Sequence, residues 1–361
     1  MTAPSAVSPP DALSALAPAW DATAGTEALP MQRYAWIRAC ADTPVAGGRA
    51  HVLYVGDVHA PDAIGPLVVR PSPWGGRRLE LLGMRALGEP TDLVGGGENG
   101  ALGHLAETVA QLRIPLTLHR IRAESGAVRA IQGAFRGRGV VRLRPDIGWP
   151  GITLEAGSPE PEARLNGGRR SDLRRARRLA ERTGPVTCSI ESPAEGEHLD
   201  RLLDEAMRVE AAGWKSHAGS ALLKDQALAS FYRRYAAAAS REGALRLCFL
   251  RIGGKTAAMQ FAVELGERFW LLKIGYDEAF ARCSPGTLLI LETLRYAAAR
   301  GLKSYEFLGT PQPWIGMWTK EIRPCVSVRA YPARGGGMVA LAADLVHSGW
   351  LRLAKLRTRG A

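Results

Sequence analysis

The alternation of hydrophobic and polar positions is clearest between residues 245 and 276. Three runs alternate apolar and polar side chains, Leu245–Ile252, Lys255–Leu265 and Arg268–Tyr276, and such alternation is typical of half-buried strands. Gly253-Gly254 and Gly266-Glu267 separate the runs, and short connections of this kind favour tight hairpin turns. The pattern therefore predicts a three-stranded antiparallel meander.

A helix and a further strand are expected after this meander. Ser284-Pro285-Gly286 opens a helical stretch that runs to Arg300 and is stopped by Gly301. Ser at the N-cap and Pro in the first turn are strong start signals for a helix. Lys303–Leu308 then predicts a strand that ends at Gly309.

A basic helix and several other elements are expected before the meander. The basic helix covers Ser171–Thr183, with Ser171 as its N-cap and Gly184 as its stop. It is followed by a strand over Val186–Ile190 and by helices over Glu197–Ala212 and Lys224–Glu242. The Pro- and Gly-rich stretch Gly148–Glu162 is a plausible domain boundary.

The first half of the chain predicts a mixed unit of helices and strands. The expected helices are Met31–Ala41 and Gly100–Leu112, and the expected strands are His51–Gly56, Ile64–Arg70, Arg78–Leu82 and Ile114–Ile121. Gly95-Gly96-Gly97 lacks the Gly-Lys-Ser/Thr of a phosphate loop and a clear preceding strand, so we interpret it as an ordinary loop.

The length of 361 residues suits two domains. We expect a flexible N-terminus over residues 1–26, a first domain over 27–150, a second domain over 151–335 and a basic C-terminal helix over 336–361. The fold class is α/β (α+β), with a mixed, mostly antiparallel sheet flanked by helices in each domain. Met1–Ser8 has neither part of a secretory signal, and no apolar run approaches the length of a spanning helix, so we expect a cytoplasmic location.

The net charge of +12 is concentrated in two segments. Residues 164–182 contain eight arginines against Asp172 and Glu181, and residues 350–359 contain four basic residues and no acid. The basic helix allows three interpretations: it holds an anionic acceptor such as a nucleotide- or lipid-linked sugar through Arg174 and Arg178, it binds RNA, or it is a solvated face. The segment Met338–Leu356 is loosely amphipathic, so it either contacts an anionic membrane surface or packs onto the protein.

The sequence shows no motif for disulfide bonding, for metal binding or for a nucleophilic serine. Five scattered cysteines and seven histidines show neither a disulfide framework nor metal-ligand spacing, so we predict no metal. A Gly-x-Ser-x-Gly elbow is absent as well. Direct transfer within a ternary complex is therefore favoured over a covalent enzyme intermediate.

The order meander, Ser-Pro-Gly helix, strand resembles the second half of the GNAT acetyltransferase fold. The resemblance is closest to the two-domain branch of BioF2-like and CelD-like (BcsL-like) acetyltransferases, which is similar to the FemABX peptidyltransferases. It covers Arg164 to Arg323 well and Trp20 to Arg122 more loosely. The residues that carry it are Gly213-Trp214-Lys215, Phe231-Tyr232, Gly275-Tyr276-Asp277, Ser284-Pro285-Gly286-Thr287-Leu288, Tyr305-Glu306-Phe307-Leu308-Gly309 and Trp318-Thr319-Lys320.

The resemblance implies two tandem GNAT-like domains, of which the second binds acyl-CoA and the first shapes the acceptor cleft. A helix N-terminus offers unpaired N–H groups and a positive dipole end, which suits the pyrophosphate of coenzyme A. The expected donor residues are Leu272, Lys273, Ile274, Ser284, Pro285, Gly286, Thr287 and Leu288. The loop departs from the usual pattern of an Arg/Gln and several glycines, and the FemABX relatives use an aminoacyl-tRNA donor instead.

The resemblance also implies candidates for the chemistry of acyl transfer. Glu306 is a candidate general base or, alternatively, a strand glutamate paired to an arginine. Tyr276 is a candidate proton donor to the leaving thiolate, and Asp277 either fixes the following loop or accepts a proton.

Four further residues are candidates for acceptor binding. Lys215 would hold an anionic acceptor beside Trp214; alternatively, Trp214 belongs to the core and Lys215 is solvated. Tyr232 and Gln260 complete the candidate acceptor site.

The expected donor is acetyl-CoA or another acyl-CoA. The expected acceptor is an amine or hydroxyl of a saccharide or cell-envelope precursor. A tRNA is expected as a partner only if the protein is an aminoacyl transferase. A non-catalytic nucleic-acid-binding protein that uses the arginine helix is the remaining alternative.

Overall fold

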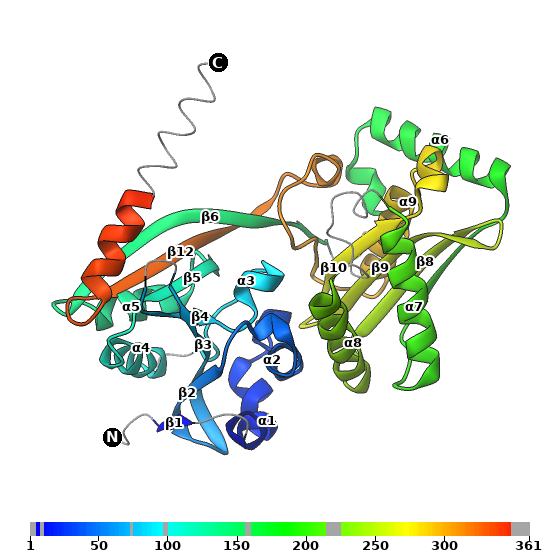
Figure 1. Cartoon of the computed structure of the whole chain (residues 1–361). Coiled ribbons are helices and arrows are strands. Elements are labelled where there is room, and N and C mark those ends of the chain that lie inside the picture. The colour runs from blue at the N-terminus through cyan, green and yellow to red at the C-terminus, as the bar shows by residue number, and fades with distance from the viewer. Residues whose placement is uncertain are drawn as a thin grey trace. The chain divides into compact units, whose positions relative to one another are not determined.

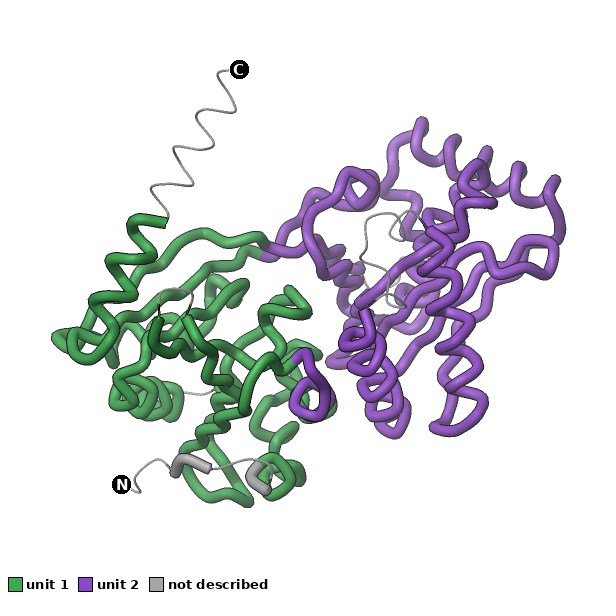
Figure 2. The backbone as a smooth tube through the Cα atoms, viewed as in Figure 1, with its two compact units in different colours: residues 1–37, 46–147, 324–361 green, residues 38–45, 148–323 purple. Residues whose placement is uncertain are grey.

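The computed structural model describes residues 5–7, 11–72, 75–96, 100–155, 160–213 and 225–347. The chain forms two compact units (Figure 2). Unit 1 contains residues 1–37, 46–147 and 324–361, and unit 2 contains residues 38–45 and 148–323. The division differs from the expected one, because the chain after residue 323 belongs to unit 1 and not to the second domain.

Unit 1 is a sheet with helices packed against it (Figure 1). Its strands, in spatial order, are β1 (Ser5–Val7), β2 (Ala50–Asp57), β3 (Ala60–Pro71), β4 (Arg77–Leu81), β5 (Leu116–Arg122) and β12 (Ile322–Pro332). Only the β4–β5 pair of this series is parallel. The helices are α1 (Asp11–Ala24), α2 (Tyr34–Ala41), α3 (Met84–Leu87), α4 (Ala101–Gln111) and α5 (Gly126–Ala134), with short 3-10 turns at Pro30–Gln32 and Pro44–Ala46.

Unit 2 is built around the predicted meander. Its strands, in spatial order, are β6 (Gly139–Thr153, of which residues 139–147 belong to unit 1), β11 (Ser304–Glu306), β10 (Arg268–Tyr276), β9 (Lys255–Leu265), β8 (Leu245–Ile252) and β7 (Val186–Glu191). The helices are α6 (Gly167–Thr183), α7 (Glu197–Ala211), α8 (Gln226–Arg241) and α9 (Pro285–Ala299), with 3-10 turns η3 (Pro161–Arg164), η6 (Glu278–Cys283) and η7 (Ile315–Met317). The three meander strands have the predicted bounds, and β10–β11 is the parallel pair.

The two units share one connection pattern. In unit 1 the antiparallel strands β2, β3 and β4 lead through α4 into β5, which is parallel to β4. In unit 2 the antiparallel strands β8, β9 and β10 lead through α9 into β11, which is parallel to β10. The parallel strand then pairs with an antiparallel strand, β12 on β5 and β6 on β11. The expected repeat of one mixed, mostly antiparallel unit is therefore confirmed.

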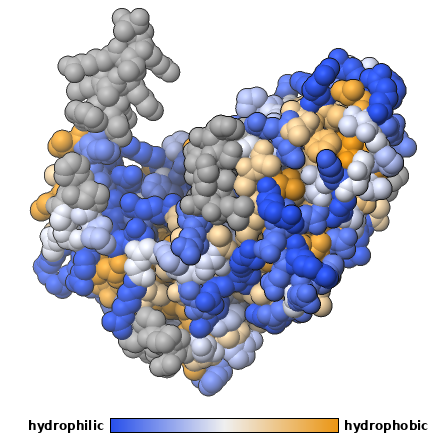
Figure 3. All heavy atoms as spheres, turned by 45° about the vertical axis from the view of Figure 1, so that its right-hand side comes forward, coloured by the Kyte–Doolittle hydropathy of each residue, from blue (hydrophilic) through white to orange (hydrophobic). Residues whose placement is uncertain are grey.

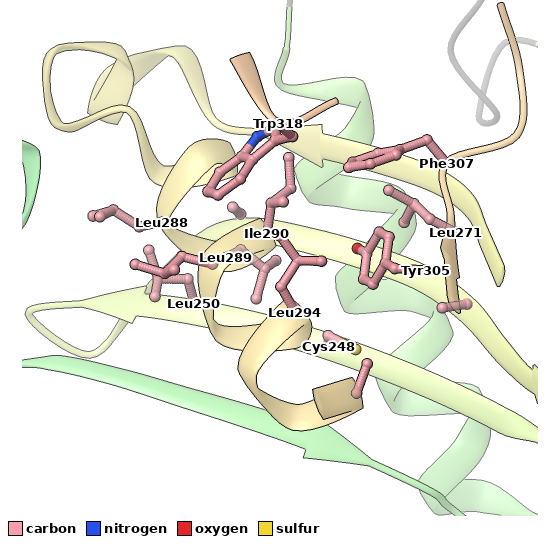
Figure 4. Packing of buried hydrophobic residues seen from close by; sticks show 14 of the residues in the cluster. Cys248, Leu250, Leu271, Leu288, Leu289, Ile290, Leu294, Tyr305, Phe307 and Trp318 are labelled. Atoms are coloured by element: carbon pink, nitrogen blue, oxygen red, sulfur yellow. The ribbon is translucent and has the colours of Figure 1, made fainter. Parts of the chain in front are cut away.

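The core of unit 2 lies between α9 and the meander (Figure 4). Leu289, Ile290 and Leu294 of α9 pack against Cys248 and Leu250 of β8, and Tyr305 of β11 closes the same cluster. Tyr305 stacks on Phe269 with ring centroids 4.9 Å apart. Alternation along β9 turns Phe261 to the other face, where it contacts Tyr232 of α8 at a centroid distance of 5.3 Å.

The expectation of a flexible N-terminus over residues 1–26 is wrong for residues 11–24, which form α1. Leu13, Leu16 and Trp20 recur at helical spacing and are almost fully buried. The Trp20 indole N–H also donates to the carbonyl of Gln32 at 2.8 Å. The Ala- and Pro-rich composition concealed this apolar stripe.

Three other boundaries differ from those expected. The basic helix begins at Gly167, four residues early, because the Asn166 side chain accepts the Arg169 N–H and replaces Ser171 as the N-cap. β6 runs to Thr153 through the expected boundary stretch. β11 ends at Glu306, and Leu308 beyond it has a positive φ of 53°.

The chain after β12 packs onto unit 1. Residues 337–347 are helical, and Asp344 in this helix bonds Arg78 at 3.0 Å and the Tyr331 hydroxyl at 2.6 Å. Packing onto the body of the protein is thus what the structure shows for this part of the C-terminal segment. The helix also exposes Met338, Val339, Leu345 and Val346.

Replacing Trp20 with Ala tests the role of α1. We expect the free energy of unfolding to fall by about 3–5 kcal/mol, because a fully buried aromatic side chain and its hydrogen bond are lost. Urea denaturation of the full chain measures the change, with Ala15→Gln on the exposed side of α1 as the control. An unchanged midpoint for Trp20→Ala would mean that α1 does not contribute to the fold.

Candidate active site

The parallel pairing in unit 2 stops well before β10 ends. β10 pairs with β11 over Arg268, Phe269 and Trp270 only, whereas its pairing with β9 continues to Tyr276. The register with β9 shifts between Leu271 and Lys273. A bulge of this kind re-aims the side chains that follow it. The second half of β10 therefore extends beyond β11 along one edge of the meander.

The start of α9 lies against this extension of β10. A Cβ placed on Gly286 would be 3.7 Å from Cδ1 of Tyr276 and 3.9 Å from Cδ1 of Ile274. Both side chains are half-buried and pack on the α9 core. Three of the predicted site residues thus meet at one place, where the end of β10 and the start of α9 come together.

The first turn of α9 presents the positive end of the helix. Ser284 has a φ of 48° and its side chain does not cap the helix, although it occupies the expected N-cap position. Thr287 and Leu288 donate their N–H groups to the carbonyl of Ser284 at 3.0 and 3.1 Å. In the part of the chain that the structure describes, the N–H of Gly286 has no acceptor. This turn can therefore receive an anion close to the backbone.

Helix α7 reaches β10 at Gly275, from the face of the sheet opposite to Ile274, Tyr276 and Gly286. A Cβ on Gly275 would lie only 2.8 Å from the Cα of Glu210, so only glycine permits this approach. Glu210 is buried, with an exposed fraction of 1%, and its side chain passes Gly275, next to Tyr276. The sequence could have indicated that Glu210 is buried, because Leu199, Leu203 and Glu210 all fall on the buried stripe of α7.

Part of unit 2 is similar to a known protein family. Residues 167–314, all within unit 2, match the family model described as an acetyltransferase (GNAT) domain. This segment is similar to a GNAT acetyltransferase domain. The expected resemblance to the GNAT fold is confirmed for this segment, while the BioF2-like or CelD-like branch stays a prediction.

Solved structures with the same fold cover most of the chain. The C-terminal domain of a putative lysylphosphatidylglycerol synthetase from Agrobacterium fabrum superposes with a TM-score of 0.52 at 14% identity, over 85% of this chain and 94% of that one. L-PGS from Bacillus licheniformis gives 0.52 at 12% identity, over 88% and 90%. FemX gives 0.53 at 12% identity, over 89% and 95%. A search of curated proteins found no match. These likenesses show the fold alone.

Lys273 and Tyr232 meet on the other face of the unit 2 sheet. The Lys273 ammonium lies 5.3 Å from the centroid of the Tyr232 ring, a cation–π distance. Tyr232 is buried, with an exposed fraction of 1%, and belongs to the aromatic packing of α8. Because alternate residues of a strand point to opposite faces, Lys273 lies on the side away from Ile274 and Gly286.

Glu306 is fixed by two neighbouring side chains. It is buried, and its carboxylate accepts the Trp149 indole N–H at 2.9 Å and the Arg323 guanidinium at 3.2 and 3.4 Å. This environment matches the alternative interpretation of a strand glutamate paired to an arginine. A carboxylate held in this way anchors β11 to β6.

Gln260 lies inside the core and away from solvent. Its Oε1 accepts from the Tyr305 hydroxyl at 3.5 Å, and that hydroxyl lies 3.1 Å from Thr293 Oγ1. Burial raises the pKa of the Tyr305 phenol well above its usual range, so the phenol stays protonated. The Nε2 of Gln260 has no partner among the described residues. Gln260 therefore orients a buried hydroxyl network under α9.

The other predicted site residues have structural surroundings of their own. Asp277 accepts the Ala279 N–H at 2.9 Å and so fixes the loop before α9, which is one of its two expected roles. Pro285, Leu272 and Leu288 are buried. Trp214 and Lys215 lie outside the described residues.

Helix α6 presents a row of exposed arginines. Leu173 and Ala180 bury one side of the helix, while Arg174, Arg178 and Arg182 follow one another at four-residue spacing and are exposed. Within the described ranges these three have no ion-pair partner. Hydrophilic residues gather at the upper right of Figure 3, the end at which α6 lies in Figure 1.

Two absences concern the described residues only. No group of three or more His, Cys, Asp or Glu side chains among them could hold a metal ion. No helix among them is both long and apolar enough to cross a membrane.

Two alanine substitutions test the packing around β10. Gly275→Ala should lower the free energy of unfolding by about 1–3 kcal/mol, since its Cβ would press on the α7 backbone. Gly286→Ala should change it by less than about 0.5 kcal/mol, because the nearest atom lies at an ordinary contact distance of 3.7 Å. Denaturant titration measures the free energy of unfolding of both variants. If both substitutions lower it equally, the close approach of α7 to Gly275 is contradicted.

Proposed function

We propose that the GNAT domain of unit 2 transfers an acyl group from acyl-CoA to an amine or hydroxyl acceptor by direct transfer. The observation that carries the proposal is the meeting of the α9 start with the part of β10 that extends beyond β11. A thioester donor with a charged pyrophosphate and a long neutral arm needs such a pair: a helix N-terminus for the charge and a strand edge for the arm.

The donor residues follow from this arrangement. The backbone N–H of Gly286 would hold the pyrophosphate, with Ser284 and Pro285 shaping the turn. The pantetheine arm would follow β10 past Leu272 and Ile274. Gly286 allows a phosphate to come close, since a side chain at this position would fill the space between Tyr276 and Ile274.

Acyl transfer needs a base for the acceptor and a proton for the leaving thiolate. The acceptor nitrogen or oxygen attacks the thioester carbon, the C–S bond breaks, and the thiolate takes a proton. We assign the proton donor to Tyr276, which borders Gly286. Glu306 already binds Trp149 and Arg323, so we do not assign it the role of base.

Titration calorimetry with acetyl-CoA and longer acyl-CoAs tests the donor site. We expect micromolar binding by the wild type and at least tenfold weaker binding by Gly286→Glu, since an anionic side chain would repel the pyrophosphate. Gly133→Glu is the matched control, because Gly133 is a helical glycine of α5 with no atom near its Cβ position.

Each outcome of the titration has a separate meaning. Loss of binding in Gly286→Glu alone supports the donor site at α9. Equal loss in Gly133→Glu would show a general effect of charge. If folded wild type binds no acyl-CoA at all, the acyl-CoA assignment is wrong.

An aminoacyl-tRNA donor is the second candidate, favoured by the row Arg174, Arg178 and Arg182 on α6 and by the resemblance to FemABX peptidyltransferases. The three exposed guanidiniums have no carboxylate partner among the described residues, as a phosphate-backbone site requires. A polyanion acceptor, such as a nucleotide- or lipid-linked saccharide, would use the same arginines.

Binding of tRNA as a function of salt concentration tests this candidate. The double substitution Arg174→Glu and Arg178→Glu should weaken binding and reduce the slope of log affinity against log salt by roughly one to two. Arg175→Glu serves as the control because Arg175 already pairs with Asp172 at 3.2 Å. A slope that is the same in all variants would remove α6 as a nucleic-acid site.

A further inference from the structure

Unit 1 contains a charged pocket that is separate from the GNAT domain. It lies where β5, β6 and β12 run together, within residues 119–146 and 327–329 of unit 1. Its polar lining consists of His119, Arg142, Arg144, Asp146, Ser327 and Arg329. None of the candidate site residues named from the sequence is among them.

The strand periodicity explains why these side chains share a face. Arg142, Arg144 and Asp146 are alternate residues of β6, and Ser327 and Arg329 are alternate residues of β12, so each set points to one side of its strand. The intervening β12 residues Val328 and Ala330 are buried in the opposite core, under α4 and α5. The pocket therefore occupies the face of the sheet that those helices leave open.

A bulge in β5 places His119 in the pocket. Val326 pairs with Ile121 and Val328 with Leu118, so two β5 residues stand opposite Ser327 alone. The second of them, Arg120, adopts a φ of 55°. Arg120 is held there by its guanidinium, which donates to the Ile147 carbonyl at 3.0 Å. The irregular backbone is thus fixed by a buried side chain.

The contacts of His119 exclude a hydrolytic triad. Its Nδ1 lies 3.3 Å from Asp146 Oδ2 and 3.2 Å from Ser327 Oγ. A triad needs the serine and the carboxylate on opposite ring nitrogens, and here both contact the same one. His119 is therefore not placed to relay a proton from Ser327 to Asp146.

Asp146 is already engaged within the protein. Its carboxylate accepts the N–H groups of Arg120 at 3.0 Å and Ile147 at 2.8 Å. The hydrogen bond from His119 is the largest influence that lowers the pKa of Asp146, to about 2. Asp146 is therefore ionised at neutral pH, and the lining holds three arginines, Arg142, Arg144 and Arg329, against this one carboxylate.

The arginines carry excess positive charge. Arg329 lies 3.2 Å from Asp344, but Asp344 also binds Arg78 and the Tyr331 hydroxyl. One carboxylate is thus shared by two guanidiniums. Arg142 has no ion-pair partner in the described part of the chain. Guanidiniums gathered in this way attract an anion with several acceptor oxygens.

We propose that this pocket binds the phosphoryl group of a phosphorylated small molecule. A tetrahedral anion can accept bonds from guanidiniums of two strands and from the Ser327 hydroxyl at once, which a planar carboxylate satisfies less well. The ligand is either a free phosphate or pyrophosphate, or the phosphate of a nucleotide-linked or lipid-linked compound. The proposal holds whether or not unit 2 uses acyl-CoA.

Histidine-detected NMR of the full chain tests the pocket, with inorganic phosphate and pyrophosphate as probes. We expect a saturable shift of one histidine signal, identified as His119 by its absence in His119→Gln. Arg142→Gln should weaken the apparent affinity at least tenfold, and Ser327→Ala should weaken it severalfold. Arg175→Gln on α6 is the matched control and should leave the affinity unchanged, and Gly286→Glu should also retain it.

Two further probes distinguish the sources of the phosphate. A nucleoside diphosphate sugar that binds more tightly than pyrophosphate would indicate a nucleotide-linked ligand. Vesicles containing a lipid monophosphate that compete with pyrophosphate would indicate a lipid-linked one. If the His119 signal does not move at 10 mM pyrophosphate, or moves equally in Arg142→Gln, the proposal is wrong. Arg142 is only half-buried, so its variant should remain folded, and the unchanged histidine signals would verify this.

Discussion

The short pairing between β10 and β11 is the constraint on which the GNAT-like fold of unit 2 depends. Three residue pairs join these parallel strands, and beyond them Leu308 turns into a left-handed conformation that leaves the sheet. Glu306, the last residue of β11, is tied to β6 through Trp149 and to Arg323. Because β11 is anchored on the β6 side and stops early, the second half of β10 can face the start of α9.

A short parallel strand pair and a residue with positive φ also occur in unit 1, where they border a different kind of site. β4 and β5 share one parallel pair, Leu79 with Leu116, and β5 also passes through a left-handed residue, Arg120. In unit 2 the strand end exposes a helix start and a strand edge. In unit 1 it carries a histidine and borders a group of arginines. One fold thus supports two chemical environments, because the residues that follow the parallel strand differ.

Local patterns predicted the meander and the helix start well. Gly turns and alternation fixed the bounds of β8, β9 and β10, and Ser284-Pro285 marked α9. The pairing partners of β6 and β12 could not be predicted, because they join segments more than 150 residues apart and no local signal encodes them. For the same reason the ion pair of Glu306 with Arg323, and the pocket around His119, depend on tertiary contacts. Glu210 carried a weak signal, since a carboxylate on an apolar helical stripe needs an explanation.

The discontinuous course of unit 1 has a consequence for biosynthesis. Its sheet needs β12, yet residues 148–323 must be translated first, because they separate β12 from the rest of the unit. Until then β5 presents an open edge with Leu118 and Ile121 beside it, the kind of edge that pairs with other chains. Unit 2 has all its strands as soon as β11 has left the ribosome. The nascent chain is therefore expected to complete its C-terminal half first, in reverse of the usual vectorial order.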